Sequence, residues 1–166
     1  QGVVQNGFGD TKNHEAKMAD YNSSLYISTS NTNLHPAIYK SDDGVNFSKV
    51  FEYTGPTFYP PNPAAYIMYR TLDLEYLDIE INPGLYSITD DWYGNCYITK
   101  LNPDGTFTTT KLGSRDWWTK DIISFNNYAY AGFYNDWSLY FTMRRTQDPM
   151  MKATWLNVSE PAFGTD

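Results

Sequence analysis

The sequence predicts an all-β domain made of three copies of one antiparallel, four-stranded unit. Two observations predict it. Aromatic residues make up 17% of the 166 residues, including fifteen Tyr and five Trp, and aromatic side chains favour strands. A short pattern centred on tyrosine also recurs three times along the chain. We expect one domain over residues 1–166, with units at about 17–53, 77–112 and 121–158.

Each copy of the pattern begins with a turn-forming asparagine. A tyrosine lies four residues after each asparagine, and a basic residue lies fourteen residues after each tyrosine. The asparagines are Asn22, Asn82 and Asn126, the tyrosines are Tyr26, Tyr86 and Tyr130, and the basic residues are Lys40, Lys100 and Arg144. The shared spacing predicts that the three tyrosines occupy matching environments.

A turn and a further strand close each unit. Asp43-Gly44 and Asp104-Gly105 are hairpin signals, because glycine adopts positive φ at little cost. An aromatic residue follows each closing turn and is predicted to be buried between units: Phe47, Phe107 and Trp155. The expected strands are 17–21, 24–29, 37–40 and 47–53, then 77–81, 85–89, 95–101 and 106–112, then 121–125, 128–133, 138–144 and 153–158.

The run Ser41-x-Asp43-Gly44-x-x-Phe47 resembles an Asp-box, the turn found between the third and fourth strands of blades in sialidase-like and related β-propellers. The resemblance implies that each unit is a propeller blade of four antiparallel strands. Propellers have four to eight blades, so three blades leave the ring incomplete. We expect a fragment of a larger chain or a ring that is closed by oligomerisation, and an open stack of sheets is the remaining alternative.

In such blades, the second-to-third and fourth-to-first strand connections emerge at one rim, here called the loop rim. The short first-to-second and third-to-fourth turns share the opposite turn rim. The loop rim is rich in aromatic and short polar residues, and its predicted ligand-binding residues are Trp92, Tyr93, Trp117, Trp118, Asp136 and Trp137. Aromatic faces beside a few polar groups suit a sugar, although these tryptophans also suit a lid over the blade ends.

Residues 71–81 alternate between apolar and acidic side chains, with one slip between Tyr76 and Leu77. A β-bulge at the slip would keep the apolar residues on one face and the acids on the other. Paired carboxylates at strand spacing are compatible with a glycosidase. A solvated strand face explains them more simply.

Composition excludes several classes of function. A net charge of −7 argues against nucleic acid, and no apolar run is long enough to insert in a membrane. Cys96 is the single cysteine and is expected to be a buried thiol. No motif points to a metal, a cofactor or a catalytic residue, so none is expected.

The leading hypothesis is a non-catalytic, carbohydrate- or receptor-binding module of an extracellular or virion-surface protein. Its partner would be a glycan or a cell-surface receptor, and the chain would be a homo-oligomer or part of a larger chain. The first alternative is a fragment of a sialidase-like glycoside hydrolase. The second is a structural subunit of a viral tail or surface assembly.

Overall fold

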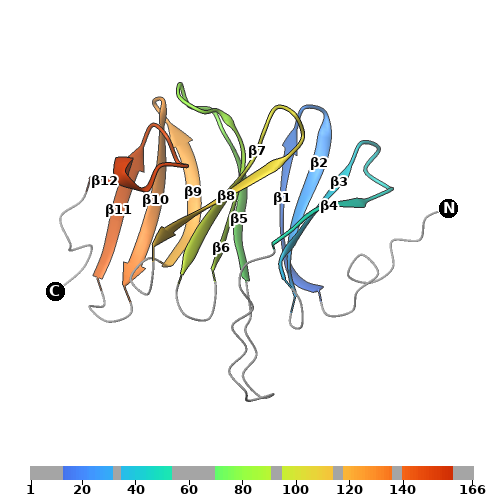
Figure 1. The fold of residues 1–166 in the computed structure, drawn as a ribbon, viewed down its shortest axis with the longest axis horizontal. Coiled ribbons are helices and arrows are strands. Elements are labelled where there is room, and N and C mark those ends of the chain that lie inside the picture. Colours follow the sequence, from blue (N-terminus) through green and yellow to red (C-terminus); the bar gives the residue numbers. More distant parts are fainter. Residues whose placement is uncertain are drawn as a thin grey trace, which may run out of the picture.

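The computed structural model describes residues 13–31, 35–53, 70–90, 95–113, 118–135 and 140–158. These residues form three four-stranded antiparallel sheets, each with its strands in sequence order (Figure 1). The first sheet holds β1 (Asn13–Tyr21), β2 (Ser24–Asn31), β3 (Ala37–Ser41) and β4 (Ser48–Glu52). The second holds β5 (Arg70–Leu77), β6 (Gly84–Asp90), β7 (Cys96–Leu101) and β8 (Phe107–Gly113). The third holds β9 (Trp118–Phe125), β10 (Tyr128–Asn135), β11 (Tyr140–Thr146) and β12 (Leu156–Asn157), with a 3-10 turn, η2 (Lys152–Thr154), before β12.

An Asn-Ser pair forms the tight turn between β1 and β2, and an Asn-Asn pair forms the turn between β9 and β10. Asn22 and Ser23 have φ of 49° and 60°, and Asn126 and Asn127 have φ of 48° and 63°. Positive φ at both central residues is the hairpin turn that matches strand twist, and asparagine tolerates it well. The repeated asparagine is therefore explained by backbone conformation.

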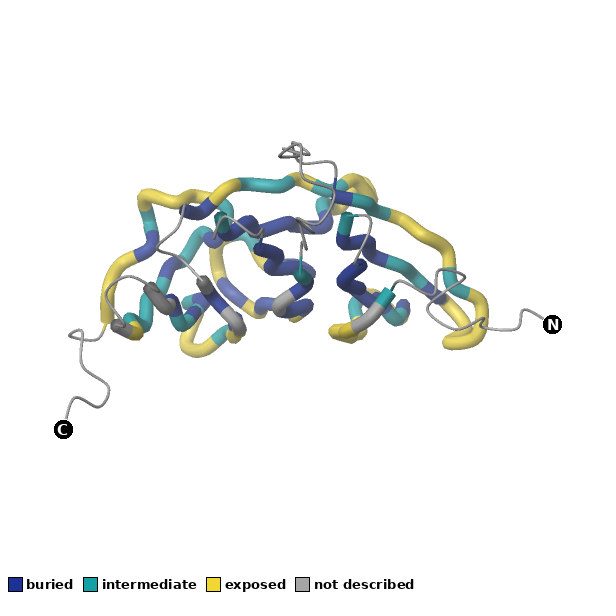
Figure 2. Tube along the Cα trace, turned by 90° about the horizontal axis from the view of Figure 1, so that it is seen from below, coloured by how far each residue is buried: buried dark blue, intermediate teal, exposed yellow. Residues whose placement is uncertain are grey.

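The sheets stand side by side, with the first strands β1, β5 and β9 adjacent in that order. The second sheet therefore has both faces covered, and every residue of β6 and β7 is buried. Figure 2 shows the buried residues gathered in the middle of the row and exposed residues towards both ends. We call the space between the first and second sheets the first seam, and that between the second and third sheets the second seam.

Each seam has its own apolar cluster. The first-seam cluster contains Tyr26, Ile38, Leu74, Leu85 and Leu101. The second-seam cluster is larger and contains Leu77, Ile79, Tyr86, Ile88, Cys96, Ile98, Leu112, Ile122, Ala129, Ala131, Phe133 and Trp155. Cys96 is a buried free thiol, as its strand-like context predicts.

The predicted fold class is confirmed: the chain is all-β, with three antiparallel four-stranded sheets arranged like propeller blades. Two predicted strands are misplaced. The first strand of the second unit is Arg70–Leu77, not 77–81, because the chain leaves the sheet before Asn82, whose φ is 67°. The last strand is only Leu156–Asn157, because η2 occupies most of the first half of the predicted range.

The repeat holds in the first two units and slips by one residue in the third. Tyr26 pairs with Lys40 and Tyr86 with Lys100, as the spacing predicts. Tyr130 pairs with Arg145 rather than Arg144, because the third unit has one more residue between the partners. Tyr130 is also only half-buried, whereas the other two tyrosines are buried; the matching environments are therefore limited to two units.

The predicted core aromatics differ in burial. Trp155 is buried, with its ring 5.5 Å from that of Phe133. Phe107 and Phe47 are half-buried, so the prediction that they are buried is wrong for both. Phe107 nevertheless packs against Phe51 at the first seam, with a ring separation of 4.8 Å.

The third-to-fourth turn of the first unit is closed by side chains. The backbone N–H of Gly44 donates to Ser41 Oγ at 2.9 Å, and those of Val45 and Asn46 donate to Asp43 Oδ1 at 2.8 and 2.7 Å. The bonds from Asn46 and Val45 hold the pKa of Asp43 well below its ordinary value. Gly44 has φ of 73°, which explains the glycine. The relation of this turn to the Asp-box stays a prediction.

Candidate functional site

The meander brings the strand ends that flank the predicted ligand-binding loops to one rim, along the lower edge of Figure 1. The ends of β2, β6 and β10 and the starts of β3, β7 and β11 lie there. Trp118 is the first residue of β9, but its side chain is not described. The other predicted residues, Trp92, Tyr93, Trp117, Asp136 and Trp137, lie outside the described residues.

A fixed ion pair marks the loop rim of the second sheet. Arg70 opens β5, Asp90 closes β6, and the two residues are direct cross-strand partners. Arg70 Nη2 donates to Asp90 Oδ2 at 2.7 Å and Arg70 Nε donates to Oδ1 at 3.3 Å. Asp90 is 1% exposed, and a buried carboxylate needs such a partner. The pair therefore holds the half-exposed guanidinium in one orientation at the rim.

Glu15 extends this polar group onto the first sheet. It lies at a bulge in β1 with φ of 44° and is exposed. Ser30 Oγ donates to Glu15 Oε2 at 3.1 Å and accepts the backbone N–H of Thr71 at 2.8 Å. The negative charge of Glu15 contributes, after Asp90, to the raised pKa of Arg70. The loop rim thus carries a carboxylate and a guanidinium on adjacent sheets.

Amides complete the described part of this rim cluster, which we define as Asn13, Glu15, Asn31, Arg70 and Asp90. Asn31 Nδ2 donates to Asn13 Oδ1 at 2.7 Å across β1 and β2. The cluster combines acceptors and donors from the ends of four strands, β1, β2, β5 and β6, on two adjacent sheets. Such a mixture suits the hydroxyl groups of a sugar and also suits a structural network.

A second group of carboxyls lies on the first strands, one step further from the loop rim. Asp73 is buried and faces the second seam, where its Oδ2 accepts the backbone N–H of Ile122 at 2.9 Å. Its Oδ1 accepts the N–H of Leu74, also at 2.9 Å. Burial, together with the neighbouring carboxyl of Asp121, raises the pKa of Asp73 to about 6. Burial also raises the pKa of Glu75, with added contributions from Asp121 and Asp20.

This placement corrects the interpretation of the acidic strand. The bulge lies between Thr71 and Asp73, not between Tyr76 and Leu77. Alternate residues of β5 face one neighbouring sheet or the other, so Asp73 enters a seam instead of a solvated face. Ile81, expected on the apolar face, is 48% exposed. A carboxyl with a raised pKa beside a second carboxyl is an arrangement that can give and take protons near neutral pH.

Sequence reasoning missed Glu15, Arg70, Asp90 and Asp121 as site residues. Their positions could have identified them, because each lies near a strand end or a bulge, where charged side chains reach the rim. Within the described residues, no cluster of His, Cys, Asp and Glu is arranged to hold a metal ion. Among the same residues, no helix is long and apolar enough to cross a membrane.

No protein family matches the sequence, and no curated protein matches it. Several solved structures resemble the fold. One of them is an α-L-arabinofuranosidase from Clostridium thermocellum, with a TM-score of 0.52 and 13% identity over 87% of this chain and 50% of that chain. Another is a thermostable family-43 glycoside hydrolase, with a TM-score of 0.35 and 10% identity over 89% of this chain and 72% of that one.

The first similarity supports the propeller-like fold, and the second is too distant to carry an argument. This chain spans half the length of the arabinofuranosidase. The molecule is therefore an all-β, propeller-like array of three blades.

Proposed function

We propose that the chain is a carbohydrate-binding β-propeller module that holds a glycan at the loop rim without cleaving it. The observation that carries the proposal is the convergence of the strand ends at one rim, beside the rim cluster. Propeller-like sheets position loops from several strands together, and ligand sites favour such places. The fold similarity to an α-L-arabinofuranosidase agrees with a carbohydrate ligand.

In this proposal the aromatic residues supply stacking surfaces and the rim cluster supplies polar contacts. The proposed aromatic contacts are Trp92, Tyr93, Trp117, Trp118 and Trp137, with Asp136 as a polar partner. Arg70 and Glu15 would contact sugar hydroxyls from the adjacent strand ends. We further propose that the module acts outside the cell or on a virion surface, as a homo-oligomer or within a larger chain.

Glycan-array binding followed by titration tests this function. We expect at least one glycan to bind and to quench tryptophan fluorescence. Trp137→Ala should weaken that binding about tenfold or more while the protein stays folded, since loss of one stacking surface rarely unfolds a protein. Glu15→Gln should weaken it less. Absence of any bound glycan, or unchanged affinity in the folded Trp137→Ala protein, contradicts the proposal.

The Asp73–Asp121 pair favours a second candidate function, that of a glycoside hydrolase. Burial raises the pKa of Asp73 to about 6, and a general acid works best when its pKa lies close to the working pH. Hydrolysis of a panel of chromogenic glycosides, compared between the wild-type protein and Asp121→Asn, tests it. If the wild-type protein hydrolyses a glycoside and Asp121→Asn does not, the chain is a glycoside hydrolase and not a binding module.

An exposed apolar face favours the third candidate, a structural subunit. On the third sheet Ile123 and Phe125 are 53% and 61% exposed, and they line a hollow of about 370 Å³ with Tyr130 and Met143. Assembly would cover such a face. Light scattering of the purified chain tests it: a closed oligomer without glycan binding would support this role over the first.

A further inference from the structure

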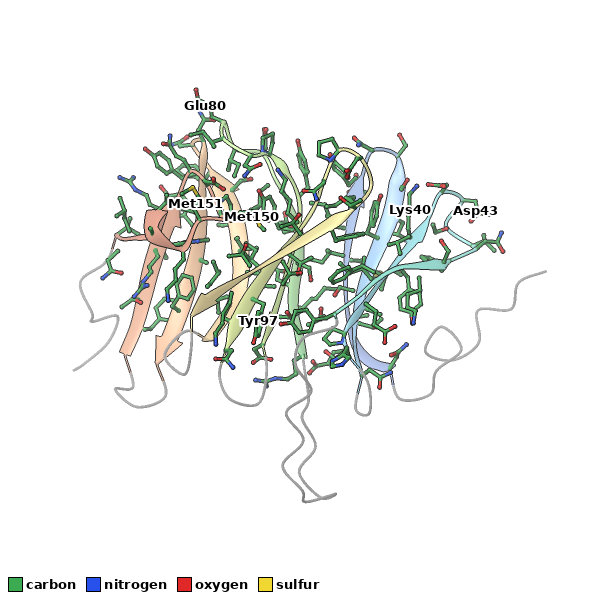
Figure 3. The ribbon with its side chains drawn as sticks, viewed as in Figure 1. Lys40, Asp43, Glu80, Tyr97, Met150 and Met151 are labelled. Carbon is green, nitrogen blue, oxygen red and sulfur yellow. The ribbon has the colours of Figure 1, made fainter. Side chains whose placement is uncertain are left out.

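A second cavity lies at the turn rim, opposite the site proposed above, and opens onto the first seam. Its volume is about 360 Å³, within the range of small-molecule sites. Its lining includes Tyr21, Tyr26, Lys40, Val50, Leu101 and Phe107. Figure 3 shows Lys40 in the upper half of the first sheet, away from the loop rim.

The repeat supplies an internal comparison, because the second seam contains the same three residues one unit later. Asn82, Tyr86 and Lys100 correspond to Asn22, Tyr26 and Lys40. Lys100 Nζ donates to Asn82 Oδ1, and Asn82 Nδ2 donates to Asp148 Oδ1 at 2.9 Å. The third sheet thus supplies the second seam with a carboxylate partner.

Met150 also packs on the apolar cluster of the second seam and lies there in Figure 3. Asp148 and Met150 both belong to the long segment between β11 and β12, so this one segment fills the space over Tyr86 and Lys100. Protein atoms therefore occupy the second-seam counterpart of the cavity.

The first seam stays open because the corresponding turn is short. Between β7 and β8 the chain turns within residues 102–106, where the N–H of Asn102 donates to the carbonyl of Thr106 at 2.8 Å. Asp104 accepts from the N–H and hydroxyl of Thr106, at 2.9 and 2.6 Å. Its carboxylate is therefore bonded within its own turn. The second sheet has no counterpart of Met150 to place over Tyr26.

The cavity combines aromatic walls with a compensated charge. Tyr26 and Leu101 are buried in its floor, and Tyr21 is held by stacking on Tyr76 at a ring separation of 5.4 Å. Lys40 Nζ lies 2.9 Å from Asp42 Oδ1, and Ser24 Oγ donates to the same oxygen. The ammonium group of Lys40 is therefore balanced by a carboxylate of its own sheet, whereas the carboxylate near Lys100, that of Asp148, comes from the next sheet.

We propose that this turn-rim cavity is a second binding site, for one neutral pyranose residue of a glycan. The apolar face of the sugar ring takes the place that Met150 takes in the second seam. Lys40, Asp42 and the exposed amide of Asn22 form hydrogen bonds with the hydroxyl groups of the sugar. Asp42 and the net charge of −7 oppose an anionic ligand, and the polar group at Lys40 opposes a purely apolar one.

Saturation-transfer NMR with the full chain tests the proposal. The probes are the methyl pyranosides of glucose, galactose, mannose, xylose and N-acetylglucosamine, with glucuronic acid and cyclohexanol for comparison. At least one neutral pyranoside should bind, and neither comparison compound should bind as well. Lys40→Met, which removes the ammonium donor, should weaken binding about tenfold or more. Lys49→Met is the matched control, because Lys49 is exposed and paired with Glu52 outside the cavity.

Val50→Trp provides a second variant, since it fills the cavity from the exposed strand β4 and should abolish binding. Absence of binding by every neutral pyranoside overturns the proposal, as does unchanged binding in folded Lys40→Met and Val50→Trp proteins. If the protein binds glucuronic acid better than the neutral pyranosides, the proposal that the ligand is neutral is wrong. Binding that is lost in Trp137→Ala but kept in Lys40→Met belongs to the loop rim; that result rejects the turn-rim site and leaves the proposed function standing.

Discussion

The two seams join equivalent faces of repeated sheets by different means. The second seam has the larger apolar cluster, which includes Trp155, and the buried carboxyl of Asp73 lies in the same seam. The first seam has a smaller apolar cluster and a row of buried hydroxyls, where Ser28 Oγ bonds to Thr71 Oγ1 and lies 3.4 Å from Ser87 Oγ. The same repeated sheet therefore forms one interface that is mainly apolar and one that is lined in part by hydroxyl groups.

The difference matters because the two kinds of contact have different energetics. Apolar burial stabilises the fold in proportion to the area removed from water, and it tolerates small shifts of one sheet against the other. Buried hydroxyls contribute little net stability, but they are costly if unpaired and so fix the register of the two sheets. We infer that the second seam supplies most of the stability and the first seam defines the geometry beside the rim cluster and the turn-rim cavity.

The largest expected effect is at the second seam. Trp155→Ala removes a buried ring that contacts Phe133 and whose Nε1 donates to the carbonyl of Pro149 at 3.2 Å. We expect the free energy of unfolding to fall by about 3–5 kcal/mol. Denaturant titration followed by circular dichroism measures it. Phe107→Ala, at the half-buried equivalent in the first seam, is the control and should cost clearly less; equal losses would remove the distinction between the seams.

A smaller effect concerns pH at the second seam. The folded pKa of Asp73 is about 6, above its ordinary value of 3.8. The folded state therefore binds this proton more tightly than the unfolded state. The resulting stabilisation is fully present below about pH 3.8 and is lost as pH rises through 6.

Asp73→Asn should abolish this decline between pH 4 and 6, measured as unfolding midpoints over that range. Asp121 lies beside Asp73, and Glu75 lies near Asp121, so neither is suitable as a control. Asp78→Asn, at an exposed neighbouring position, is the control. An identical decline in Asp73→Asn and the wild-type protein would mean that another carboxyl causes it.

Local sequence patterns predicted the strands within each sheet, whereas the contacts between sheets could be seen only in the structure. Tyr26 and Lys40 could be paired from the sequence because a hairpin joins them at constant spacing. Ser28 and Thr71 are 43 residues apart, and Asp73 and Ile122 are 49 apart, each in different sheets. No periodicity within a strand encodes such contacts, and for this reason the burial of Asp73 was misjudged.

The same limit applies to the candidate site. The loop rim followed from topology alone, since a four-stranded meander leaves its longer connections on one side. The Arg70–Asp90 pair was not foreseen, because its meaning depends on cross-strand register. The turn-rim cavity was not foreseen either, because it results from a difference in length between two turns and not from any motif.

The smallest predicted effect tests whether the hydroxyl row of the first seam acts as a unit. Ser28→Ala removes one partner of a buried pair and leaves the Thr71 hydroxyl without that bond, so it should cost about 1 kcal/mol. Thr71→Val, which keeps the shape of the side chain, should cost a similar amount. The double variant should cost no more than either single variant, because it leaves no unsatisfied hydroxyl from this pair. Chemical denaturation of the four proteins gives the coupling free energy. Simple addition of the two losses would show that the hydroxyls act independently, and the first seam would then differ from the second only in its amount of apolar surface.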